Sequence, residues 1–271
     1  MKSVLCMVVG LMGLGISSEI AQSRLPFANH QEAASIARRH QRSVRGQTLT
    51  SQGMPAIRLK FDKAFKYAGS QEFILYDVAH AEQHFFVEAD KEGRVKRFYW
   101  IQFEGYLPSN NHSHNYKANK TIKLAGLDFI ADAYAININA NPGRSDSDGN
   151  RARTFLESKG YRMKSNDVML QRLVHLIDKE KRNELMIIYT EDLSEQRLTA
   201  ADLAPDGRAA SRWDEISKGL LERAVGGMFC FHPIKSTTKA ATRRRTPNVG
   251  PDLSGRLVDR ILRASRYNAA F

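Results

Sequence analysis

The chain has 271 residues, of which 42% are hydrophobic and 26% are charged, so it is neither disordered throughout nor embedded in a membrane. Its length suits one domain or two small ones with a substantial core. The formal net charge of +12 favours association with phosphates, anionic lipids or acidic polymers, and it says nothing about the fold.

The first 23 residues have the layout of a secretory signal peptide. Lys2 precedes an apolar run from Val4 to Ile16, and Ala21 and Ser23 have the small-residue spacing that a signal peptidase accepts. The run is short for a bilayer span. We therefore expect a soluble, secreted or periplasmic protein with no integral membrane domain after cleavage. A buried or anchoring N-terminal helix is the alternative.

Strand and helix signals organise the middle of the chain. Residues 24–54 are expected to form a peripheral segment, because their helical pattern has a thin apolar stripe. Alternating stretches rich in β-branched and aromatic residues then predict strands at residues 56–61, 72–78, 84–89, 94–104, 168–178 and 183–193. Helices are expected at residues 123–136 and 150–160, and in a closing helix with Trp213, Ile216, Leu220 and Ala224 on one face.

These elements predict an α+β domain over residues 55–232, because short loops rather than alternating helices join the strands. The domain is expected to contain a mainly antiparallel sheet of about six strands in two hairpin groups. Its helices are expected to be segregated to one face of that sheet.

The C-terminal segment, residues 233–271, differs in composition from the rest. Its first part has almost no large apolar residue and predicts a flexible linker, and a short basic amphipathic helix follows. Arg243, Arg244 and Arg245 make this tail a candidate for binding an anionic partner, either a membrane or a nucleic acid. A solvated tail, or a helix docked on the domain, is the alternative.

The sequence lacks the familiar catalytic motifs. It contains no Gly-x-Ser-x-Gly, no phosphate-binding glycine-rich loop, no Cys-x-x-Cys and no His-Glu-x-x-His. Once the signal peptide is removed, Cys230 is the one cysteine, so no internal disulfide forms. We expect Cys230 to be buried and unreactive rather than activated by His232.

The loop before the second helix has acidic and amide side chains at the spacing of a calcium-binding loop, namely Asp146, Asp148, Asn150 and Glu157. Arg151 occupies the position where such a loop needs glycine for its sharp turn. We therefore expect Asp148 or Asn150 to cap the helix that begins near residue 151.

The register of the hairpin over residues 76–104 decides where its polar side chains point. The loop 91–93 ends in Gly93, which predicts a three-residue connection. That connection pairs Glu88 with Lys96, Phe86 with Phe98, His84 with Trp100, Glu82 with Gln102 and His80 with Glu104. A two-residue loop would pair Glu88 with Arg97 instead and would lose most of these matches.

The predicted register gathers candidate ligands on the less apolar face of the hairpin. The candidate metal ligands are His80, Glu82 and Glu104 on that face and His112 and His114 in the loop that follows. Imidazoles with a carboxylate are the ligand set of catalytic zinc or another divalent transition metal. The candidate ligand-binding residues on the same face are Trp100, Gln102 and His84.

One distance narrows the metal set. His80 and His84 are about 13 Å apart along an extended strand, too far to share an ion. The expected ligands are therefore His80 and Glu104 with His112 or His114, while His84 stacks beside Trp100. The alternative is a surface His80 that hydrogen-bonds Glu104 next to a solvated loop.

The absence of catalytic motifs favours a non-catalytic binding or structural domain as the function. Two alternatives stay open. One is a metal-dependent, hydrolase-like enzyme that uses the His/Glu cluster of the first hairpin, and the other is binding of an anionic surface by the basic tail.

Overall fold

The computed structural model describes residues 41–117, 120–140 and 143–231. The predicted signal peptide, residues 24–40 of the peripheral segment and the basic tail lie outside the described residues. His232 lies outside them too, so its proximity to Cys230 stays untested. Among the described residues, no helix has the length and apolar character needed to cross a bilayer.

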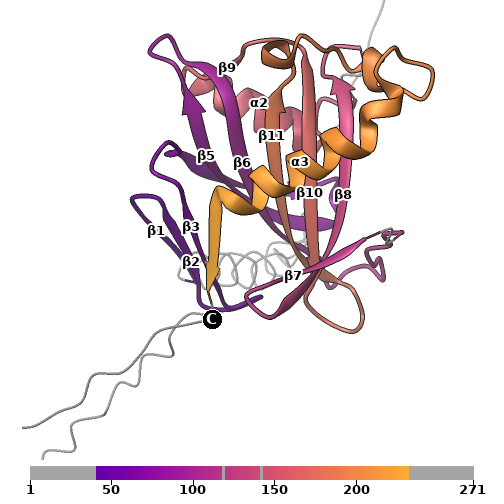
Figure 1. The fold of residues 1–271 in the computed structure, drawn as a ribbon. Helices are drawn as coiled ribbons and strands as arrows, with labels where there is room; N and C mark the ends of the chain where they lie inside the picture. Colours follow the sequence, from indigo (N-terminus) through magenta and orange to yellow (C-terminus); the bar gives the residue numbers. More distant parts are fainter. Residues whose placement is uncertain (1–40, 118–119, 141–142, 232–271) are drawn as a thin grey trace, which may run out of the picture. The chain divides into compact units, whose positions relative to one another are not determined.

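An eight-stranded sheet forms most of the described fold (Figure 1). Its spatial order is β4 (Lys66–Leu75), β5 (Ala79–Ala89), β6 (Arg94–Tyr106), β11 (Asn183–Asp192), β10 (Asp167–Leu176), β8 (Leu127–Asn137) and β7 (Thr121–Leu124). All of these neighbours are antiparallel. The two-residue strand β9 (Arg162–Met163) pairs in parallel with β6.

A second, four-stranded sheet lies in the order β1 (Arg42–Arg45), β2 (Thr48–Ser51), β3 (Ile57–Phe61) and β12 (Met228–Phe231). Two of its strands fall inside the segment expected to be peripheral. Leu49 on β2 is fully buried in the large core, so this part of the segment belongs to the folded domain.

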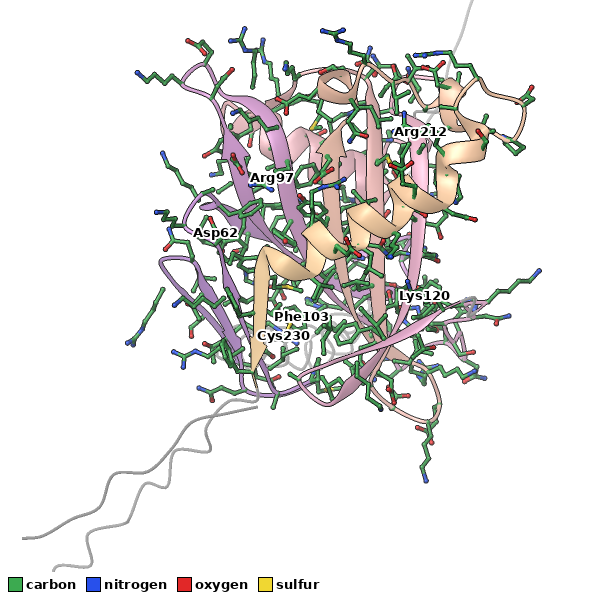
Figure 2. The ribbon with its side chains drawn as sticks, viewed as in Figure 1. Asp62, Arg97, Phe103, Lys120, Arg212 and Cys230 are labelled. Carbon is green, nitrogen blue, oxygen red and sulfur yellow. The ribbon has the colours of Figure 1, made fainter. Side chains whose placement is uncertain are left out.

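The two α-helices of the described residues pack on opposite faces of the eight-stranded sheet, so the expectation that helices share one face is wrong. Helix α3 (Trp213–Gly226) buries Ile216, Leu220 and Ala224 in the large core, which also contains Phe103 (Figure 2). Helix α2 (Asp148–Ser158) buries Ala152 and Leu156 in a second cluster. Figure 1 shows α3 in front of the strands and α2 behind them.

Strands β5 and β6 explain why both faces need a cover. Phe86 on one face packs in the large core, whereas Phe85 and Val87 pack in the second cluster. When apolar side chains lie on both faces of a sheet, both faces must be covered. A single layer of helices covers only one face. We call the two sides the α3 face, which carries Phe86, and the α2 face, which carries Phe85.

The α+β class and the mainly antiparallel pairing are confirmed, but over residues 41–117, 120–140 and 143–231 the sheets contain twelve strands rather than six. The six expected strands are present, with the helix at 150–160 and the closing helix. The strands not anticipated are β1, β2, β7, β8, β9 and β12. Three 3-10 helices, η1 (Ser194–Gln196), η2 (Ala201–Leu203) and η3 (Ala210–Arg212), lie between β11 and α3.

The helix expected at residues 123–136 is wrong, because this stretch forms the β7–β8 hairpin. Ala125 and Gly126 connect the two strands with positive φ angles of 49° and 78°, a geometry that ends any helix there. On β8, Phe129 and Ala131 are buried with alternate residues between them less buried. The apolar spacing therefore fits a strand as well as a helix.

The three-residue register predicted for the β5–β6 hairpin is wrong beyond the first pair. Ala89 lies opposite Val95, as predicted, but the next pair is Glu88 with Arg97, so Lys96 is an extra residue in a β-bulge. Arg97, labelled in Figure 2, forms an ion pair with Glu88 at 2.6 Å. From this bulge onward every predicted partner on β6 is displaced by one residue.

Gly93 and Gly160 provide a matched test of this hairpin, since both have positive φ, at 78° and 82°. A Cβ added to Gly93 would lie 2.2 Å from the carbonyl oxygen of Gly160, whereas a Cβ added to Gly160 meets nothing within 4 Å. We expect Gly160→Ala to cost about 1 kcal/mol of unfolding free energy, from its backbone conformation alone.

Gly93→Ala is expected to cost at least about 2 kcal/mol more, because the backbones of β6 and β9 must separate. Urea denaturation of both variants measures the difference. Equal losses would show that the two backbone segments are not in contact.

Candidate functional site

The displaced register puts the predicted site residues on two different faces of the sheet. His80, Glu82 and His84 lie on the α3 face, opposite Gly105, Phe103 and Ile101. Glu104 lies opposite Ala81, and therefore on the α2 face with Gln102 and Trp100. The predicted cluster of His80 with Glu104 is thus wrong, and so is the stacking of His84 on Trp100.

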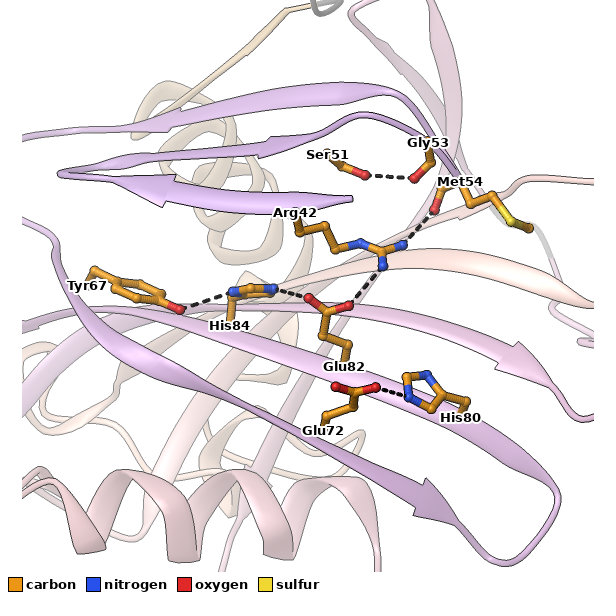
Figure 3. A network of polar contacts seen from close by, with 9 residues as sticks. All are labelled: Arg42, Ser51, Gly53, Met54, Tyr67, Glu72, His80, Glu82 and His84. Atoms are coloured by element: carbon orange, nitrogen blue, oxygen red, sulfur yellow. Dashed lines mark hydrogen bonds and ion pairs between the residues drawn. The ribbon is translucent and has the colours of Figure 1, made fainter. Parts of the chain in front are cut away.

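On the α3 face a chain of hydrogen bonds joins four side chains (Figure 3). Arg42 donates from Nη1 to Oε2 of Glu82 at 2.8 Å, and Oε1 of Glu82 lies 2.8 Å from Nε2 of His84. Nδ1 of His84 lies 3.2 Å from the hydroxyl of Tyr67. These contacts use both carboxylate oxygens of Glu82 and both ring nitrogens of His84. We therefore interpret the four side chains as a structural network.

His80 is held separately on the same face. It pairs through Nε2 with Glu72 on the neighbouring strand β4. The prediction that His80, Glu82 and His84 point to one side is therefore confirmed, and side chains of β4 and β1 make hydrogen bonds and ion pairs with them (Figure 3).

On the α2 face, Glu104 and Glu184 are direct neighbours across β6 and β11. His114, in the loop after β6, is placed beside them by a hydrogen bond from its backbone N–H to the carbonyl of Lys181 at 2.8 Å. One ligand atom from each of the three side chains lies within 4.8 Å of the other two, the one such group found among the described residues. His112 is exposed, and its ring packs against Tyr106 instead.

In this carboxylate–imidazole cluster, defined as Glu104, His114 and Glu184, the last two residues are buried without full hydrogen bonding. Glu184 is 2% exposed and His114 is 6% exposed. Nδ1 of His114 lies 3.2 Å from Oε2 of Glu184, yet neither that oxygen nor Nε2 of His114 has a hydrogen-bond partner. Buried polar atoms without partners are rare in folded proteins and ask for an explanation.

Burial dominates the electrostatics of the cluster. It raises the pKa of Glu184 to about 8, with the nearby Glu104 adding to the rise. It also raises the pKa of Glu104 to about 7 and lowers the pKa of His114 to about 4. All three groups are therefore pushed toward their neutral forms when no cation is present.

A row of amide side chains connects this cluster to the rest of the α2 face. Gln71 donates to Gln83 at 2.7 Å, Gln83 donates to Gln102 at 2.8 Å, and Gln102 donates to Glu104 at 2.6 Å. The indole N–H of Trp100 also donates to Gln102, at 3.1 Å. These bonds fix the orientation of Gln102 and thereby of the Glu104 carboxyl group.

A cavity of about 450 Å³ lies between α2 and the sheet, on the same face. The apolar part of its lining includes Val95, Phe98, Trp100, Ile136, Leu156 and Leu170. Polar groups also line it, among them Asp148, Asn166 and Thr190. The hydroxyl of Thr190 is buried and has no hydrogen-bond partner.

The start of α2 forms one edge of the cavity. Its N-cap is Ser147, whose side chain accepts from the backbone N–H of Asn150, so the expectation that Asp148 or Asn150 caps this helix is wrong. Asp146 pairs with Arg144 outside the cavity. Burial raises the pKa of Asp148, which lines the cavity.

The predicted site residues therefore separate into four groups. Glu104 and His114 come together with Glu184, which was not predicted. Trp100 and Gln102 lie on the same face, and Trp100 lines the cavity. His80, Glu82 and His84 belong to the α3-face network, and His112 to the loop surface. The alternation of β11 puts Glu184 on one side of a strand, but no sequence pattern shows that this strand pairs with β6.

Comparison of the chain with protein-family models, with curated proteins and with solved structures finds no match. The arrangement of its own residues is therefore the basis for a functional proposal.

Glu82→Gln tests the α3-face network. Burial raises the pKa of Glu82, but the hydrogen bond from His84 and the charge of Arg42 outweigh it, so the pKa is lowered. We expect the variant to lose about 2–4 kcal/mol of unfolding free energy at pH 7, because it removes the carboxylate charge that faces the buried Arg42 guanidinium.

The pH dependence follows from the direction of that shift. A carboxylate with a lowered folded pKa stabilises the protein above its usual pKa of 4.5 and loses this effect as the pH falls through the folded pKa. The difference in unfolding free energy between wild type and variant, measured by urea denaturation, should therefore become smaller below about pH 4.5. Glu157→Gln, at an exposed position on α2, is the control and should change stability by less than about 0.5 kcal/mol.

Proposed function

We propose that this domain is a binding protein that takes one small molecule into the cavity between α2 and the sheet. The observation that carries the proposal is the cavity itself, at about 450 Å³. Pockets for small organic ligands measure about 300–1,000 Å³ and combine an apolar lining with a few polar groups. The lining here combines apolar residues with polar groups and with two acidic and two basic side chains, whose formal charges cancel, namely Asp148, Glu157, Arg153 and Arg162.

The chemistry of the lining specifies the class of ligand. Phe98 and Trp100 offer flat aromatic surfaces for an apolar, ring-containing body. The unpartnered hydroxyl of Thr190 offers one hydrogen bond inside the cavity, and Asp148 lies at its edge. We therefore propose an uncharged, amphipathic molecule with a hydrogen-bonding group that reaches Thr190.

The neutral fluorophore N-phenyl-1-naphthylamine is a suitable probe, because an anionic dye would also be attracted by the net charge of +12. In the Trp213→Phe background Trp100 is the one tryptophan, so energy transfer reports binding in the cavity. We expect saturable binding of one probe molecule with a dissociation constant in the micromolar range.

Ala152→Phe fills the cavity from α2, since Ala152 is 3% exposed and lines the space. It should weaken binding of the probe at least tenfold. Thr154→Phe adds the same side chain to the exposed side of α2 and should leave binding unchanged. Equal affinity in the two variants, or no saturable binding by the wild type, contradicts the proposal.

Thr190→Val gives an independent check that does not need a ligand. Valine has the shape of threonine without the hydroxyl, which is buried and unpartnered. Removal of such a group should raise the unfolding free energy of the unliganded protein by about 1 kcal/mol. Thermal unfolding measures it, with Thr154→Val as the exposed control. A loss of stability in Thr190→Val would mean that the hydroxyl has a partner.

Export remains part of the proposal, supported by Lys2 and the apolar run from Val4 to Ile16. Mass spectrometry of the N-terminus after expression with a secretion system would show whether cleavage follows Ser23. An anionic partner for Arg243, Arg244 and Arg245 is likewise proposed from the sequence, and co-sedimentation with anionic liposomes tests it.

A metal-dependent enzyme is the second candidate, and one observation favours it: Glu104 and His114 of the predicted ligand set lie together with Glu184. In that case the metal ligands are Glu104, His114 and Glu184 on the α2 face. The predicted ligands His80 and Glu82 lie on the α3 face and do not belong to the set. Hydrolysis would additionally need an open coordination position for water.

A further inference from the structure

We propose that Glu104, His114 and Glu184 bind one divalent transition-metal ion. The inference concerns a different site from the ligand cavity, so it is independent of the small-molecule binding proposed above, and it is the premise of the second candidate, the metal-dependent enzyme. It does not depend on the ion being catalytic.

The first support is geometric. The three side chains come from β6, β11 and the loop between β6 and β7, and their ligand atoms lie within 4.8 Å of one another. When an ion is bound at metal–ligand distances of about 2.0–2.2 Å, its ligand atoms lie less than 4.8 Å from one another. Modest side-chain rotations would therefore complete the site.

The second support is the pair of unsatisfied atoms. His114 and Glu184 are each more than nine-tenths buried, and Nε2 of His114 and Oε2 of Glu184 have no hydrogen-bond partner. A neutral imidazole and an ionised carboxylate are metal ligands, whereas without an ion both leave acceptor atoms unused. A bound cation would coordinate Oε2 of Glu184 and one of the two ring nitrogens of His114.

Charge and ligand type select the ion. Two carboxylates and a 2+ ion cancel, which suits a buried position better than two carboxylates alone. Mixed oxygen and imidazole ligands without sulfur suit zinc, manganese(II) or iron(II) better than calcium or copper(I). The other charges that act on Glu184 are Asp148 and Arg172. Arg172 is already paired with Asp132 through two hydrogen bonds, of 3.0 and 2.6 Å.

The surroundings also hold the ligands in place. Gln102 donates to Glu104 at 2.6 Å, and the ring of Tyr116 stacks on the ring of His114. Outer hydrogen bonds of this kind orient metal-binding carboxylates. An ion at this position would tie the loop that carries His114 to both strands, so binding should raise thermal stability.

The test uses the untagged full chain after treatment with a chelator. Titration calorimetry with zinc chloride and with manganese chloride should give one bound ion per chain for at least one of the metals. Differential scanning calorimetry should show a higher melting temperature with that metal. Magnesium chloride at the same concentration serves as the comparison and should give a smaller shift.

His114→Ala and Glu184→Gln should each weaken binding at least tenfold and remove most of the melting shift. His112→Ala is the matched control, two residues away on the same loop, and should bind within twofold of wild type. If His114→Ala fails to fold, Glu104→Gln takes its place. Binding that is absent in the wild type, or equal in His114→Ala and His112→Ala, overturns the proposal.

Discussion

The extra residue in β6, Lys96, decides on which side of the sheet every later side chain of that strand lies. Side chains alternate along a strand, so one inserted residue exchanges the two faces. With the bulge, Tyr99 and Ile101 enter the large core beneath α3, while Trp100 and Glu104 reach the α2 face. The carboxylate–imidazole cluster on the α2 face follows from this one displacement.

The two faces then differ in how their buried polar side chains are satisfied. On the α3 face, Glu82 accepts from Arg42 and contacts His84, so its charge is compensated. On the α2 face, Glu104 and Glu184 lie side by side with a neutral imidazole and no such cation in contact. Burying two carboxyl groups together is unfavourable unless they hold protons or a cation. We therefore expect the α2 face to be the side of the sheet where a cation binds to these carboxyl groups.

Strand alternation predicted from sequence six of the twelve strands of the described residues, the antiparallel class and the common side of His80, Glu82 and His84. It could not predict the bulge, because Glu88 finds an opposite charge at Lys96 or at Arg97, and pairing rules accept both. Nor could it predict Glu184, since the contact between β6 and β11 joins residues far apart in sequence. The β7–β8 hairpin was mistaken for a helix because small residues such as Ala131 and Ala133 satisfy either period.

Anomalous diffraction from crystals of the full chain grown with manganese tests most directly that the α2 face is the functional side. The structure predicts one strong anomalous peak bounded by Glu104, His114 and Glu184, on the side of the sheet that carries Trp100. A peak beside His80 or Glu82, or density that places Glu104 on the same side as His80, would contradict both the register and the site.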